Sequence, residues 1–155
     1  MYKRILVPLE NGPSDAAILD HVGRLARACG SSVVLMHVAD GWAARNIQQL
    51  ELRESEEMRA DREYLERTRA ALAATGLDVE AVLGAGDPAH ELANAAERER
   101  CDLIAMSTHG HRQVADLFLG SVANELRHLS HVPILLVRMP PAQRKRTPAT
   151  SANPL

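Results

Sequence analysis

Hydrophobic and polar positions along the chain alternate between short apolar runs and longer stretches whose apolar residues recur with a helical repeat. The first of these stretches shows the repeat clearly, with Ile18, Val22, Leu25 and Cys29 on one helical face and Gly30 after them as a stop signal. Short apolar runs of this kind are typical of strands that are buried on both faces. The runs that predict strands are Lys3–Pro8, Ser32–Val38, Leu77–Leu83, Asp102–Met106 and Val132–Arg138.

The segments between these runs predict helices. The turn Asn11–Asp15 supplies capping residues for the first helix, and Asp87 followed by Pro88 opens another. From about Ala43 to Thr75, seven acids and six arginines at helical spacing predict a long exposed helix. The last helix is expected at Ser121–Leu129. Because strands alternate with helices, the sequence predicts an α/β fold with an open, doubly wound parallel sheet.

In such sheets the ligand crevice lies beyond the carboxyl ends of the strands, so the loops at 9–12 and 107–120 are the places to look for a site. In the second loop, Gly110 permits a positive φ and the close approach of a ligand. Gly120 and Ser121 are expected at the start of the last helix, where free N–H groups, a hydroxyl and the helix dipole favour a phosphate. A plain turn followed by a plain N-cap is the alternative interpretation.

Several of these motifs together resemble the universal stress protein family, over a stretch from about Tyr2 to Arg138. The nucleotide-binding branch of that family carries a glycine, two residues, a glycine, nine residues, a glycine and a serine or threonine. Gly110, Gly120 and Ser121 fit this spacing. The other matching segments are Ile5–Pro8, His37-Val38, Gly86-Asp87-Pro88, Asp102–Gly110 and Val132–Val137.

The resemblance implies a Rossmann-like, adenine nucleotide alpha hydrolase-like domain with strand order 3-2-1-4-5 and a site for ATP or AMP between the first and fourth strands. Mg²⁺ or Mn²⁺ would bind together with the phosphates, and no metal site is expected from protein ligands alone. The resemblance also implies a homodimer through the last strand, at Ile134, Leu135, Leu136 and Val137. Carried over by position, the nucleotide-binding residues are Pro8, Leu9, Glu10, Val38, Met106, Ser107, Gly110, Gly120, Ser121 and Val122, with His109, His111 and Arg112 as candidates for phosphate contacts.

Two positions depart from the family's pattern. Ser107 stands where the nucleotide-binding branch has its first glycine, and its side chain would either crowd the nucleotide or hydrogen-bond to it. Glu10 stands where those members usually have aspartate, so its carboxylate reaches about one methylene further into the pocket. These departures favour an alternative function, that of a dimeric stress adaptor that binds no nucleotide.

Catalytic groups for phosphoryl transfer are sparse in the sequence. The phosphate loop contains no lysine and no placed general base, and Arg112 is the cation near it. We therefore expect a module that acts by binding rather than by fast turnover, with a weak ATPase as a second alternative based on His109, His111 and Arg112. The pairs His109/His111 and His128/His131 lack further Cys or acidic ligands that would complete a metal site.

Composition narrows the class of protein. The 155 residues carry a net charge of −2 and only 3% aromatics, which suits one domain and argues against general nucleic-acid binding. No apolar stretch approaches the ~18–20 residues of a membrane span, and two cysteines without a disulfide pattern favour a reduced, cytoplasmic protein. From Arg138 onward the charge is +4, which leaves −6 on 1–137. The expected organisation is a family domain at 1–138 and a basic, disordered tail at 139–155.

Overall fold

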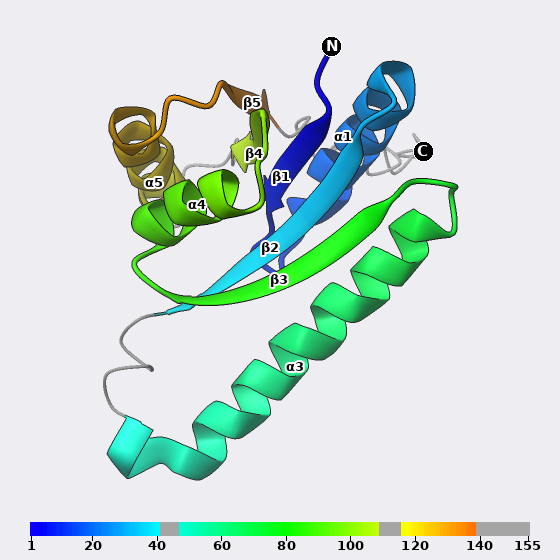
Figure 1. Cartoon of the computed structure of the whole chain (residues 1–155). Helices are drawn as coiled ribbons and strands as arrows, with labels where there is room; N and C mark the ends of the chain where they lie inside the picture. Colours follow the sequence, from blue (N-terminus) through cyan, green and yellow to red (C-terminus); the bar gives the residue numbers. More distant parts are fainter. Residues whose placement is uncertain (41–46, 109–115, 139–155) are drawn as a thin grey trace, which may run out of the picture.

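A parallel sheet of five strands in the order β3-β2-β1-β4-β5 forms the centre of the protein (Figure 1). The computed structural model describes residues 1–40, 47–108 and 116–138, and the tail predicted at 139–155 lies outside these residues. This order confirms the predicted α/β fold. The strands are β1 Arg4–Pro8, β2 Ser32–Asp40, β3 Val79–Gly86, β4 Leu103–Thr108 and β5 Ile134–Arg138; the helices are α1 Asp15–Cys29, α3 Ile47–Ala73, α4 Pro88–Arg98 and α5 Asp116–Leu129.

Several strands extend beyond the apolar runs that predicted them. β3 ends at Gly86 instead of Leu83, because its backbone stays in register with β2 as far as the pair Asp40 and Gly86. β4 likewise continues through Ser107 to Thr108, since both residues are paired with β5. A neighbouring strand therefore extends the pairing into residues whose side chains give no strand signal.

The start of α5 differs most from the sequence prediction. The helix begins at Asp116, five residues before the expected start at Ser121, so Gly120 and Ser121 lie within the helix. Residues 116–119, which the sequence places in the loop at 107–120, therefore form the first turn of α5. Glycine inside a helix costs only about 1 kcal/mol relative to alanine, so Gly120 weakens α5 locally without ending it.

Helices cover both faces of the sheet, which is why its strands are apolar throughout (Figure 1). Along β1, Ile5 and Val7 pack with residues of α1 and α3, whereas Leu6 packs with residues of α4 and α5. All three side chains are fully buried. Within the described residues, no helix is both long enough and apolar enough to span a membrane.

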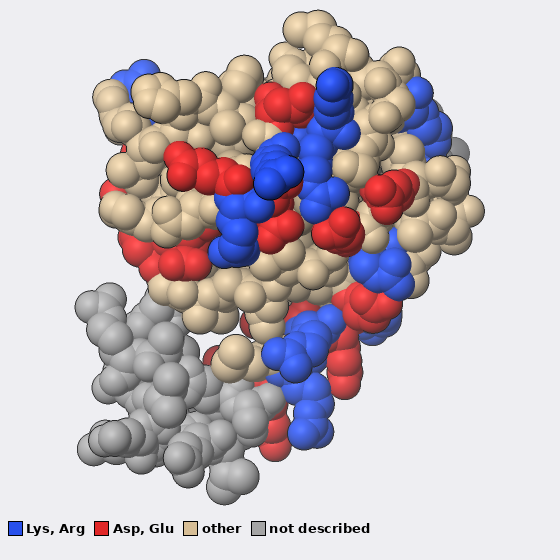
Figure 2. Space-filling model, viewed as in Figure 1, with Lys and Arg blue, Asp and Glu red and all other residues tan. Residues whose placement is uncertain are grey.

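α3 is the long charged helix that the sequence predicts. Leu65 is 2% exposed and packs under the sheet, while charged residues on the outer side pair locally, as Arg69 does with Glu66 at 2.5 Å. Figure 2 shows Lys and Arg side chains interspersed with Asp and Glu side chains over the face in view. The face shown therefore carries basic and acidic side chains side by side, without a large patch of one sign.

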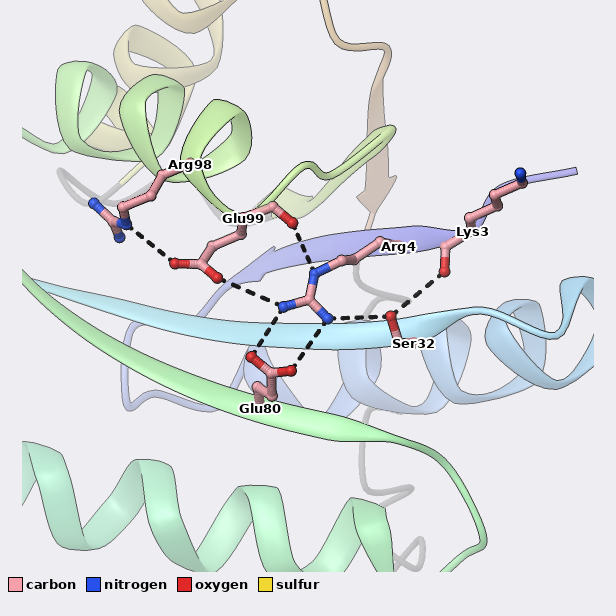
Figure 3. Close-up of polar contacts among 6 residues, drawn as sticks. All are labelled: Lys3, Arg4, Ser32, Glu80, Arg98 and Glu99. Atoms are coloured by element: carbon pink, nitrogen blue, oxygen red, sulfur yellow. Dashed lines mark hydrogen bonds and ion pairs between the residues drawn. The ribbon is translucent and has the colours of Figure 1, made fainter.

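One arginine joins three elements at the amino-terminal edge of the sheet (Figure 3). Arg4 in β1 donates from Nε to the carbonyl oxygen of Glu99 at 2.8 Å and from both terminal nitrogens to the carboxylate of Glu80 in β3. One terminal nitrogen also donates to the hydroxyl of Ser32 in β2 at 3.3 Å. The hydrogen bonds and charge of Glu80 raise the pKa of Arg4, and Arg4 lowers that of Glu80.

The sheet edge at β5 carries an exposed leucine. Leu136 is 51% exposed, whereas its neighbours Leu135 and Val137 pack toward the core. An apolar side chain on an open edge strand is a known route to pairing with another chain. The homodimer expected through Ile134–Val137 stays a prediction at this point.

Candidate functional site

A cavity of about 190 Å³ lies where β1, β2 and β4 approach their carboxyl ends, beneath α4 and α5. Parallel α/β sheets bind their ligands at this edge. Pro8 is the last residue of β1 and Pro88 is the first of α4, so strand ends and a helix start meet here. The residues that line the cavity are Pro8, Leu9, Glu10, Met36, His37, Val38, Pro88, Leu92, Met106 and Val122.

The structure brings six of the ten residues predicted for a nucleotide site into this cavity wall, namely Pro8, Leu9, Glu10, Val38, Met106 and Val122. Sequence reasoning missed Met36, His37, Pro88 and Leu92. Met36 had a signal, because alternate residues of a strand share a face and Met36 lies two residues before Val38. Pro88 and Leu92 also had a signal. They belong to the helix that follows the third strand, and that strand ends on the same side of the sheet as the first.

Ser107, Gly120 and Ser121 are predicted residues that do not line the cavity. Ser107 is in β4 and 5% exposed, and because strand side chains alternate, it faces the side of the sheet opposite to Met106 and the cavity. The serine at the first glycine position therefore does not project into the cavity. His109, Gly110, His111 and Arg112 lie outside the described residues.

The expected helix start at Ser121 is wrong, because α5 begins at Asp116, whereas the phosphate contacts at Gly120 and Ser121 stay a prediction. Gly120 and Ser121 are exposed residues of the second turn of α5, whose first turn is 116–119. Only the first four N–H groups of a helix lack an intrahelical acceptor. The backbone of Gly120 and Ser121 is thus used by the helix itself, and the free N–H groups of α5 come earlier in the chain.

The wall of the cavity is mainly apolar. Among its lining residues, only Glu10 and His37 carry ionisable side chains; the rest are proline, aliphatic residues and methionine. Such a wall favours a flat or apolar part of a ligand, with polar contacts at the edges. Gly84 in β3 contributes indirectly, because a Cβ there would come 2.6 Å from Cε of Met36, which lines the cavity.

A buried carboxylate holds the loop that follows β1. Asp15, the first residue of α1, is 3% exposed. Its Oδ1 accepts the N–H of Glu10 at 3.1 Å, and its Oδ2 accepts the N–H groups of Asn11 at 2.9 Å and Gly12 at 3.3 Å. Asn11 takes a positive φ of 58°, which turns the loop around this carboxylate.

Two residues of α3 contact side chains that hold this loop, namely Asp15 and His37. Tyr64 donates its hydroxyl hydrogen to Oδ2 of Asp15, and burial together with that carboxylate raises the pKa of Tyr64 well above its usual value. Asp61 places a carboxylate oxygen 3.3 Å from Nε2 of His37, whose Nδ1 lies 2.8 Å from the carbonyl oxygen of Leu9. Since a carbonyl oxygen only accepts, Nδ1 is the donor in that bond.

Three potential metal ligands meet on the surface beside the cavity. His90 Nδ1 lies 2.7 Å from Oδ2 of Asp87 and 4.0 Å from Oε1 of Glu125, and all three residues are exposed. Asp87 also accepts the backbone N–H of His90 as the N-cap of α4. These bonds lower the pKa of Asp87, and the same carboxylate raises that of His90. Helix capping and one ion pair account for this cluster.

Comparison with known proteins adds relatives of similar length. The model of the universal stress protein family matches residues 1–138. The universal stress protein MJ0531 of Methanocaldococcus jannaschii is 27% identical over 147 residues, which span 90% of this chain and 84% of that protein. The solved structure of the hypothetical protein MJ0577, from the same organism, has a TM-score of 0.78 at 26% identity and spans 90% of this chain and 98% of its own.

A structure of a universal stress protein in complex with cAMP is also similar. Its TM-score is 0.65 at 20% sequence identity, and the match covers 88% of this chain and 97% of that one. At this identity the likeness concerns the fold alone.

Proposed function

This chain belongs to the universal stress protein family, and on that premise we propose that it binds an adenine nucleotide, ATP or AMP, in the cavity at the carboxyl ends of β1, β2 and β4. Binding rather than fast turnover would make it a nucleotide-responsive stress module. The observation that carries the proposal is the mainly apolar wall, to which residues carried over from the family's nucleotide site contribute Pro8, Val38 and Met106.

The size of the cavity indicates which part of the nucleotide it would hold. Pockets that enclose a whole drug-sized ligand measure roughly 300–1,000 Å³, whereas this cavity measures about 190 Å³. We therefore assign the adenine and part of the ribose to it, with Val38 against the base. The phosphates would extend toward the connection between β4 and α5, where His109, Gly110, His111 and Arg112 are the proposed contacts and Mg²⁺ or Mn²⁺ the accompanying ion.

The complex of a protein of the same fold with cAMP supports adenine nucleotides as the first ligands to test. Isothermal titration of the full chain with ATP and with AMP, each with and without Mg²⁺, measures binding directly. Val38→Phe should weaken it at least tenfold, because the larger ring fills the space assigned to the base. Leu129→Phe is the matched control, since Leu129 is an exposed residue of α5 outside the cavity wall. The absence of heat with either nucleotide at high micromolar concentration would refute the proposal.

The second candidate function is the dimeric adaptor that binds no nucleotide, and the exposed Leu136 of β5 favours the dimer on which it depends. We propose pairing through Ile134, Leu135, Leu136 and Val137, with or without nucleotide. Light scattering coupled to gel filtration should find a dimer for the wild type and a monomer for Leu136→Glu, because a charge would be buried in the interface. A wild-type monomer at tens of micromolar would exclude this route to a dimer.

A further inference from the structure

The loop that forms the β1 side of the cavity is held by Asp15 and His37, and both of these residues contact α3, a helix that contributes no residue to the cavity wall. Asp61 and Tyr64 of α3 make the contacts, and neither of them lines the cavity. The two residues are three positions apart, so they project from the same face of the helix. Their targets are the carboxylate of Asp15 and the ring of His37.

The first connection passes through one buried carboxylate. Asp15 accepts three backbone N–H groups of the loop and the hydroxyl of Tyr64, and these four hydrogen bonds equal in number the roughly four lone-pair positions that a carboxylate offers. A buried charge requires such partners, because each lost hydrogen bond leaves it less compensated. The geometry of Glu10 and its neighbours thus depends on a donor, Tyr64, that lies 49 residues from Asp15 in the sequence.

The second connection passes through the cavity wall itself. His37 lines the cavity, donates from Nδ1 to the carbonyl oxygen of Leu9 and turns Nε2 toward Asp61. Its side chain is only 15% exposed, so the ring is enclosed between β2, the loop and α3. Any shift of α3 at Asp61 therefore changes the position of a wall residue and of the backbone of Leu9.

We propose that α3 positions the ligand crevice, with Tyr64 and Asp61 as positioning residues, and that ligand binding and the packing of α3 are energetically coupled. This inference rests on the proposed function for the identity of the ligand, an adenine nucleotide. Thermodynamic linkage makes this coupling reciprocal. The free energy that the packing of α3 contributes to ligand binding equals the free energy by which the bound ligand stabilises that packing.

The first test needs no ligand. In the full-length protein, Tyr64→Phe removes one hydroxyl, and hydrogen exchange at the amides of Glu10, Asn11 and Gly12 should accelerate about tenfold or more, as expected for the loss of one hydrogen bond to a charged group. Glu63→Gln is the matched control, because Glu63 is the preceding, exposed residue of α3. Unchanged exchange in Tyr64→Phe would overturn the anchoring, whether or not the protein binds a nucleotide.

The second test measures the coupling. Tyr64→Phe and Asp61→Ala should each weaken ATP or AMP binding about three- to tenfold in calorimetric titration, while Glu63→Gln binds like the wild type. Faster exchange of the loop with unchanged affinity in both variants would overturn the coupling. Asp61→Ala removes the contact with His37 and leaves the carboxylate of Asp15 untouched, so it provides a readout even where Tyr64→Phe folds poorly. A wild type that binds neither nucleotide refutes the proposed function and, with it, the coupling, while the exchange experiment still decides the anchoring.

Hydrogen exchange tests the coupling in the opposite direction. If the bound ligand stabilises the loop against α3, saturating ATP or AMP should slow exchange at the amides of Asn11 and Gly12, and it should slow it less in Tyr64→Phe. Equal exchange of these amides with and without bound nucleotide would contradict the reciprocal effect.

Discussion

The residues at the start of α1 do not cap the helix in the way that their types suggest. Ser14 occupies the N-cap position of α1, yet its side chain makes no capping hydrogen bond. It is fully buried, and among the described side chains its Oγ is the buried polar atom without a hydrogen-bond partner. The carboxylate of Asp15 instead binds the loop amides that precede the helix. A residue type that usually caps helices is thus present here without its usual bond.

Ser14→Ala should therefore leave the free energy of unfolding unchanged or raise it by up to about 1 kcal/mol, although the loss of a working serine N-cap typically costs about 0.5–2 kcal/mol. The reason is that the hydroxyl is desolvated without a compensating bond. Urea denaturation of both proteins measures the difference. A destabilisation of more than 1 kcal/mol would mean that the hydroxyl has a partner in solution.

Cys101 offers a prediction about pH. The thiol is 6% exposed, and burial raises its pKa to about 11 from an ordinary value of 9.0. In the Cys29→Ser background at pH 8, Cys101 should react with a disulfide reagent at least tenfold more slowly in the folded protein than in urea. Because the folded pKa exceeds the unfolded one, stability should also fall as the pH rises through the window from 9 to 11. Rapid modification of the folded protein would contradict the burial of this thiol.

At the scale of elements, the sequence predicted most strands and helices because each is an apolar run or an amphipathic repeat with a clear stop. The main error concerned Gly120 and Ser121, since a glycine before a serine is a typical helix start and nothing local distinguishes it from a glycine within α5. The anchor between Asp15 and Tyr64 had no local signal either. It exists only because α1 and α3 pack on the same face of the sheet.

Gly120→Ala tests the placement of the α5 start. A Cβ at Gly120 would meet no atom within 4 Å, and alanine is the better helix former by about 1 kcal/mol. The variant should therefore raise the midpoint of thermal unfolding, by roughly 2–6 °C for a chain of this size. Nucleotide affinity measured on the same variant shows whether the phosphates approach this residue. A lower midpoint would indicate that Gly120 needs a conformation that only glycine adopts.

At the scale of the whole molecule, two polar clusters, around Arg4 and around Asp15, lie at opposite ends of the strands of one sheet. Arg4 connects β1, β2 and β3 at the amino-terminal edge, and Asp15 fixes the loop at the carboxyl-end edge, where the cavity lies. Both are built from residues far apart in the sequence. We therefore expect a change at Arg4 to alter the free energy of unfolding without altering ligand affinity, because the cavity lies at the other end of the strands.

Arg4→Met should lower the free energy of unfolding by about 1–3 kcal/mol, because it removes the bonds to Glu80 and to the carbonyl of Glu99 while keeping the length of the side chain. Nucleotide affinity should stay within about twofold of the wild type, since the change lies at the far edge. Part of the contribution should disappear in acid: the pKa of Glu80 is held below its usual 4.5, so the pair is intact above that pH and is lost as the pH falls through the folded value. Chemical denaturation at pH 7 and at pH 3 measures both effects, and equal losses at the two pH values would exclude the ion pair.

The bond between Tyr64 and Asp15 also has a consequence for protein engineering. The loop after β1 is an obvious segment to exchange between members of the family when a different ligand preference is wanted. In this protein the segment to be replaced is not continuous in sequence, because the loop keeps its shape only together with the α3 side chains that support it. A chimaera that receives the segment from Pro8 to Asp15 would also need Asp61 and Tyr64, so the segment and these two residues should be transferred together.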